Sequence, residues 1–169
     1  MCEPLTEEKA QAITALLKEE VRQLIDREGA QAFDPENGPR LNRDEWVWEM
    51  SEGELRGDPC ATCIVGAYVI QHELNPRQVD RDKKSFVLFA EDLGISTDDG
   101  YGIFFGATLD AATARATPRA AMIAADVLLY AIDELGWESR DPKFNRQDIG
   151  VYRGTALRNL QQVQEVPNA

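Results

Sequence analysis

The sequence contains few of the residues on which most catalytic and metal sites depend. One histidine and three cysteines occur among its 169 residues, so acid–base and nucleophilic schemes built on histidine have His72 as their single candidate. An odd number of cysteines in a chain of this length argues against a disulfide scaffold. No apolar run approaches the roughly 18 residues that a membrane span needs, and no signal-peptide pattern precedes Thr6. We therefore expect a soluble, cytoplasmic protein that does not enter a membrane.

Basic residues are scarce relative to acidic ones. Eighteen lysines and arginines stand against 30 aspartates and glutamates, which gives a formal net charge of −12. Nucleic-acid binding needs a basic surface to meet the phosphates, so this balance argues against it. Mimicry of nucleic acid toward a basic partner stays open as an alternative. The length and an apolar content of 43% predict one globular domain, 1–169, with a core at 6–138 and a basic C-terminal extension at 139–169.

The longest stretch without a charged residue lies between Asp58 and Glu73. A helix that is apolar on every side belongs inside a core. Asp58 followed by Pro59 is a typical helix start, and Asn75-Pro76 is a typical stop. The pattern therefore predicts a central buried helix of about 17 residues, around which the chain is organised. Gly66 within it would let a neighbouring element approach closely.

Apolar residues at three- and four-residue spacing predict further helices on both sides of this one. The first is expected over Thr6–Gly29, the second over Phe86–Gly94 and the last major helix over Thr117–Gly136, with threonine caps or glycine stops at their ends. A short amphipathic helix is expected at Thr155–Val163. The predicted fold is mainly α, a compact helical domain.

Three segments carry weaker helical signals. Trp46-Val47-Trp48 alternates like a short strand, so a small β-hairpin or an ordered loop is predicted there. Ser96–Gly102 combines small polar residues with glycines and is predicted to be a loop. Gly106–Ala116 is predicted to be either a short turn of helix or irregular chain.

The most obvious chemical motif is Cys60-Ala61-Thr62-Cys63. Two cysteines at a helix start can be redox-active, but no strand pattern precedes them, and small buried cysteines are common in cores. Cys2 and His72 would complete four zinc ligands on paper. On one continuous helix, however, Cys63 and His72 would be separated by about 13 Å along the axis. We therefore expect structural cysteines, no zinc and no cofactor.

Acidic residues offer a second chemistry. Asp98, Asp99 and Asp110 flank glycines and aromatic residues, and carboxylates in such settings can hold Mg²⁺ or Ca²⁺. Their spacing lacks the calcium-loop signature. A small metal-assisted hydrolase or transferase that uses these three carboxylates is therefore the alternative function.

The preferred hypothesis is a non-catalytic protein-interaction factor. The C-terminal extension is basic on an otherwise acidic chain, and such asymmetry orients partners. It could also lie across the acidic body. Trp46, Trp48 and Trp137 are the type of residue that concentrates binding energy, although tryptophans also cover core edges. We predict an interaction surface that includes Trp46 or Trp48 with Arg146 and Arg153 at its rim, for another protein or for a second copy of the chain.

The order of these parts resembles a family of short actinobacterial and actinophage proteins of unknown function. The matching parts are Ile13–Ile25, Cys63-Ile64-Val65-Gly66-Ala67, Leu93-Gly94, Leu109-Asp110 and Thr117-Pro118. Where that family usually shows a Trp-Asn-Asp-like turn, this chain has Ala107-Thr108-Leu109-Asp110. The resemblance covers most of residues 6–136 and implies a bacterial or phage setting. It carries over no catalytic residue.

Overall fold

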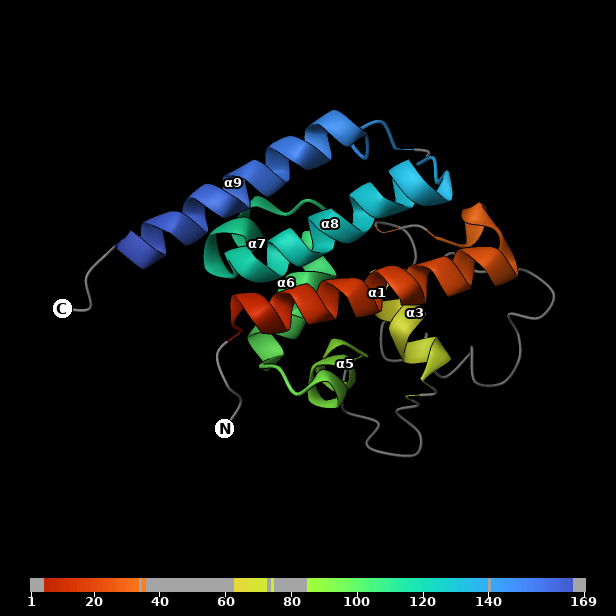
Figure 1. Cartoon of the computed structure of the whole chain (residues 1–169), viewed down its shortest axis with the longest axis horizontal. Coiled ribbons are helices and arrows are strands. Elements are labelled where there is room, and N and C mark those ends of the chain that lie inside the picture. Colours follow the sequence, from red (N-terminus) through yellow and green to blue (C-terminus); the bar gives the residue numbers. More distant parts are fainter. Residues whose placement is uncertain are drawn as a thin grey trace.

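The computed structural model describes residues 5–33, 35, 63–72, 74, 85–139 and 141–165, and this part of the chain is mainly helical (Figure 1). The prediction of a mainly α fold is confirmed. The elements are α1 (Glu7–Glu28), a 3₁₀ turn η1 (Ala30–Ala32), α3 (Ile64–Gln71), α5 (Ser85–Leu93), α6 (Thr97–Gly106), α7 (Ala111–Ala116), α8 (Pro118–Leu135) and α9 (Arg146–Glu165). The hairpin predicted around Trp46-Val47-Trp48 lies outside the described residues.

Three long helices form one side of the molecule. In Figure 1, α8 lies between α1 and α9 and packs against both. In the same view α6 passes behind α1 and α8, and it packs against α3, α5, α7 and α8. Among the described helices, none is both long and apolar enough to cross a membrane.

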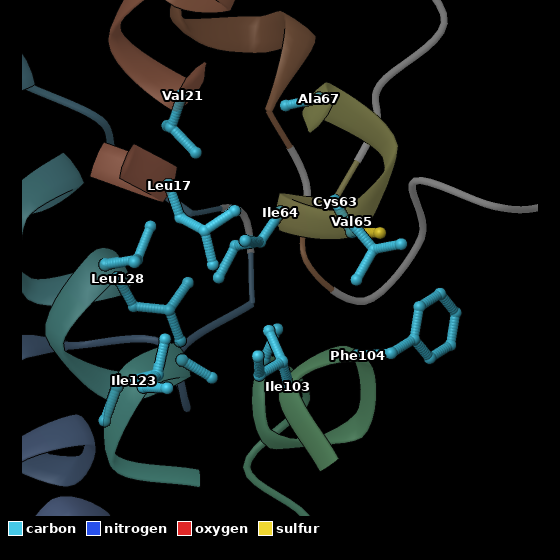
Figure 2. Close-up of a cluster of buried hydrophobic side chains, with 14 of the residues drawn as sticks. Leu17, Val21, Cys63, Ile64, Val65, Ala67, Ile103, Phe104, Ile123 and Leu128 are labelled. Carbon is cyan, nitrogen blue, oxygen red and sulfur yellow. The ribbon is translucent and has the colours of Figure 1, made fainter. Parts of the chain in front are cut away.

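Helix α1 begins and ends where its local chemistry predicts. The Thr6 hydroxyl accepts a hydrogen bond from the Lys9 backbone N–H at 3.1 Å, and Glu7 and Glu8 place negative charge on the first turn. Gly29, with a φ of 92°, ends the helix. The buried stripe of α1 points into the core that Figure 2 shows, with Leu17 fully buried among side chains of α3, α6 and α8.

Helix α8 also has its predicted bounds, but one detail of its start differs. Thr117 precedes the helix without a capping hydrogen bond from its side chain, because its hydroxyl donates to the Thr113 carbonyl at 3.3 Å instead. Pro118 takes the first helical position, and Gly136 closes the helix in the left-handed region, with a φ of 68°. Small residues dominate the buried face of α8, namely Ala120, Ala121, Ala124, Ala125 and Ala131.

The prediction of a loop at Ser96–Gly102 is wrong. Ser96 is an N-cap whose hydroxyl accepts from the Asp99 N–H at 3.0 Å, and α6 continues to Gly106. The glycines are there for packing. A Cβ built on Gly102 would lie 2.9 Å from the Ala120 Cβ, so only glycine lets α6 approach α8 this closely. Gly106–Ala116 resolves into the end of α6, a turn and the short helix α7.

The C-terminal helix is much longer than predicted. Instead of starting at Thr155, α9 starts at Arg146, and the Asn145 side chain accepts from the Asp148 N–H at 2.8 Å just before it. Ile149, Tyr152 and Ala156 are buried, and α9 packs against α7 and α8. The basic segment therefore contributes to the same core as the helices before it.

Helix α3 supplies a buried segment from Cys63 to Val69. It packs against α1, α5 and α6, and Figure 2 shows Ile64 pointing into the same cluster as Leu17 and Ile103. The start predicted at Pro59 lies outside the described residues. Cys63 is described and lies just before α3, so the helix does not run continuously from Pro59 through Cys63 as predicted. That this segment is the one around which the chain is organised stays a prediction.

Candidate functional site

The tryptophans predicted as anchors divide into two cases. Trp46 and Trp48 lie outside the described residues, so their role stays a prediction. Trp137 is part of the core, with 3% of its surface exposed. Its indole Nε1–H donates to the Phe33 carbonyl at 2.9 Å, and the two rings meet edge to face with centroids 5.0 Å apart. Trp137 therefore offers no surface to a partner.

The two arginines predicted at the rim both contact α8. Arg153 Nε lies 2.5 Å from Asp126 Oδ1, and Arg146 Nε lies 3.2 Å from Asp133 Oδ1. The partners are seven residues apart on each helix, so two turns of antiparallel α9 match two turns of α8. The basic segment thus lies across acidic positions of the body. Arg146 is 73% exposed, so its ion pair contributes little to stability.

The structure does not bring the three candidate metal carboxylates together. Asp98 and Asp99 lie in the first turn of α6, and Asp110 follows its far end, about 15 Å away along the axis. Asp99 accepts from the Ser96 hydroxyl, and Asp110 caps α7 by accepting from the Ala112 N–H at 3.1 Å. Among the described residues, no three His, Cys, Asp or Glu side chains gather as metal ligands would.

Cys63 is buried at the start of α3, where its Sγ accepts from the Gly66 N–H at 3.4 Å. The thiol therefore packs in the core beside Ile64 and Val65 (Figure 2). Cys2 and Cys60, the other two cysteines of the sequence, lie outside the described residues.

A polar cluster around the buried Glu20 joins α1, α3 and α5, and its members His72 and Asp92 lie on the exposed side. Glu20 is 6% exposed; its Oε2 accepts from Gln71 Nε2 at 2.5 Å, and its Oε1 lies 2.6 Å from His72 Nε2. The His72 ring stacks on Tyr68 with centroids 4.0 Å apart, and the Tyr68 hydroxyl donates to Asp92. We call these five residues the Glu20 cluster. Both carboxylate oxygens of Glu20 are engaged, which favours a structural role in fastening α3 to α1.

The sequence contains one signal for this cluster. Glu20 falls within the apolar stripe of α1, three residues after Leu17 and four before Leu24. A carboxylate in a stripe that faces a core must find a polar partner there. The position of His72 near the end of its predicted helix suggests an interaction with the helix dipole, whereas its ring contacts this carboxylate.

Two buried tyrosines, Tyr68 and Tyr152, make the free energy of unfolding fall at alkaline pH. Burial, together with the hydrogen bond to Asp92, raises the pKa of Tyr68, and burial raises the pKa of Tyr152. Each hydroxyl ionises in the unfolded chain near pH 10 and at a higher pH in the folded protein. Their contribution to folding is therefore complete below about pH 10 and is lost as the pH rises above it.

We expect the free energy of unfolding to fall between about pH 8 and pH 11, and to fall less in a Tyr68→Phe, Tyr152→Phe double variant. Urea titrations at the two pH values measure both falls. Tyr101→Phe is the matched control, because Tyr101 is 45% exposed and should lose stability as the parent does. An equal fall in the parent and the double variant would contradict the expectation.

A groove of about 480 Å³ lies along the first half of α8, between the first half of α1 and the part of α9 from Arg153 to Gln161. In Figure 1, α1 and α9 lie on either side of α8, which packs against both. The groove is lined by Glu7, Ala10, Gln11, Thr14, Ala15 and Lys18 of α1, Arg119, Met122, Ile123 and Asp126 of α8, and Arg153, Leu157, Leu160 and Gln161 of α9.

The groove combines apolar and charged walls. Leu157 and Leu160 are half-buried on α9 and line the groove, and neither belongs to the core cluster that the described residues form. Met122 lies half-buried on the floor. Arg153 is the one rim residue predicted from the sequence that lines it. Such a surface can bind an apolar group and orient it by charge.

In comparisons with known proteins, no protein-family model, no curated protein and no solved structure matches the chain. The resemblance to short actinobacterial and actinophage proteins therefore rests on the order of sequence parts alone.

Proposed function

We propose that the protein is a non-catalytic binding protein that contacts another protein through the groove between α1, α8 and α9. The observation that carries this proposal is the pair Leu157 and Leu160. Two leucines that line a groove without joining the core keep apolar surface in water, which costs free energy unless a partner covers it. The charged residues beside them form the polar rim that is usual around an apolar interface centre.

The shape of the groove favours a helical segment as the bound element. Its α1 wall extends from Glu7 to Lys18, which is about 16 Å along the helix axis, or three turns. The walls on both sides are themselves helices. A helical segment bound in a groove between helices is a common mode of peptide recognition.

The other parts of the functional hypothesis stay proposals. A contribution of Trp46 and Trp48 to the contact surface stays a proposal from the sequence, and the bacterial or phage setting rests on the sequence resemblance. The metal-assisted hydrolase is less well supported, because Asp99 and Asp110 serve as hydrogen-bond acceptors at opposite ends of α6.

The test replaces one groove leucine by a charged residue. Leu160→Glu places a carboxylate in the apolar part of the groove, so we expect the Kd for the native partner to rise at least tenfold, which is about 1.4 kcal/mol. The partner is first captured from host extract with the parent protein, and its affinity is then measured with purified components. Circular dichroism checks that the variant keeps its helices.

Val151→Glu is the matched control for this test. Val151 is 61% exposed on α9 and does not line the groove, so the same added charge should leave the Kd unchanged. If Leu160→Glu binds the captured partner as tightly as Val151→Glu does, the groove is not the contact surface.

A further inference from the structure

Positive charge collects in the groove of a protein that is acidic overall. Each of the three helices contributes one cation, Lys18 from α1, Arg119 from α8 and Arg153 from α9. Two anions, Glu7 and Asp126, line the same groove. The local balance is therefore one positive charge, whereas the whole chain has a net charge of −12.

The three cations of the groove differ in whether an anion of the protein already pairs with them. Arg153 is paired with Asp126, so these two charges cancel within the groove. Lys18 Nζ lies over the Tyr130 ring at 5.5 Å, a contact that leaves its charge uncompensated by an anion. The Arg119 side chain makes no ion pair or hydrogen bond among the described residues. Lys18 and Arg119 are thus the two cations that a bound molecule would meet, together with the anion Glu7, which forms no ion pair among the described residues either.

These two cations mark opposite ends of the groove. Lys18 lies beside Tyr130, and Tyr130 follows Arg119 by eleven residues on α8. Eleven residues of helix rise about 16 Å, so the two positive groups stand about three turns apart. The apolar side chains Met122 and Leu157 lie along the groove between the levels of these ends.

We propose that the occupant of the groove is an acidic amphipathic helix of about three turns. Its apolar stripe covers Met122, Leu157 and Leu160, and an acidic side chain near each end pairs with Arg119 or Lys18. This inference rests on the proposed function, because it names the class of partner that the same groove binds.

The overall negative charge of the protein does not reverse this preference. At physiological salt the Debye length is about 8 Å, so charges on the far side of the molecule are largely screened from the groove. They slow the approach of an acidic partner, whereas the pairs formed with Lys18 and Arg119 act at contact distance and lower its dissociation rate.

A displayed library of three-turn helices with randomised surface positions, selected on the purified full chain, tests the inference. We expect the enriched peptides to carry Asp or Glu on both ends of an apolar stripe. Their Kd, measured by fluorescence anisotropy with one synthesised peptide, should rise at least tenfold on the Lys18→Glu, Arg119→Glu double variant. Arg158→Glu, a charge reversal on α9 outside the groove lining, should leave the Kd unchanged.

The remaining outcomes separate the two proposals. Suppose that the enriched peptides lose binding to Leu160→Glu but carry lysine or arginine at their ends, or bind the double variant as tightly as the parent. The acidic occupant is then wrong, while the groove is still the contact surface. Enriched peptides that bind Leu160→Glu as tightly as the parent, or a selection that enriches none, would overturn the proposed function as well.

Discussion

Replacing Gly102 by valine should lower the free energy of unfolding by about 2–3 kcal/mol. Gly102 lies in α6 where that helix meets the start of α8. A Cβ built on it would lie 2.2 Å from the Thr117 Oγ1 and 2.9 Å from the Ala120 Cβ, closer than side-chain atoms approach each other. Thr117 is also held by its hydrogen bond to the Thr113 carbonyl, so the two helices must move apart to admit the new side chain.

A series of alanine variants separates this packing effect from helix propensity. Alanine favours a helix over glycine by about 1 kcal/mol. A Cβ added to Gly150 in α9 would meet nothing within 4 Å, so Gly150→Ala should stabilise the protein by about 0.5–1 kcal/mol. Gly102→Ala should destabilise it in spite of the same gain. Urea denaturation measures both, and equal stabilisation by the two variants would show that α6 does not pack closely on α8.

Helices α1 and α8 could be predicted from the sequence because local chemistry sets their ends. Thr6 accepts the first free N–H of α1, and Gly136 takes a left-handed conformation after α8. Both helices also carry a continuous apolar stripe. Neither property depends on residues far away in the chain.

Helix α6 could not be predicted in the same way, because its glycines are explained by packing against other helices and not by local sequence. Gly100, Gly102 and Gly106 are unfavourable for an isolated helix, and only the neighbours reveal why they occur. Gly100 faces Ala90 of α5, while Gly106 faces Ala121 and Ala124 of α8. Glycines that permit close helix packing and glycines that form a loop have the same appearance in a single sequence.

The candidate site was predictable to a small extent. The charge asymmetry of the sequence indicates Arg153. The groove, however, is formed by α1, α8 and α9 together, and a single sequence does not reveal which helices pack against each other. The apolar spacing of Ile149, Tyr152 and Ala156 was the available signal that α9 begins early. Polar residues and glycines between them concealed it.

The Glu20 cluster supplies the second large effect. Glu20→Ala should lower the free energy of unfolding by about 2 kcal/mol, because it removes a buried carboxylate that accepts from Gln71 and contacts His72, although the Glu20 backbone carbonyl still accepts from Gln71 Nε2 at 2.8 Å. It also leaves a space between α1 and α3. Glu20→Gln keeps one oxygen as an acceptor but turns an amide N–H₂ group toward one of these partners, so its cost should be smaller, about 1 kcal/mol.

Glu19→Ala is the control for Glu20→Ala, because Glu19 is the adjacent residue on the exposed side of α1. Its ion pair with Arg22 lies at the surface, and the loss of such an exposed pair changes stability little. Urea denaturation of the three variants at neutral pH should therefore give Glu20→Ala a lower free energy of unfolding than Glu20→Gln and Glu19→Ala. A cost for Glu20→Ala equal to that of Glu19→Ala would mean that this carboxylate does not fasten α3 to α1, and that the contacts of Gln71 and His72 are replaced by water at no loss.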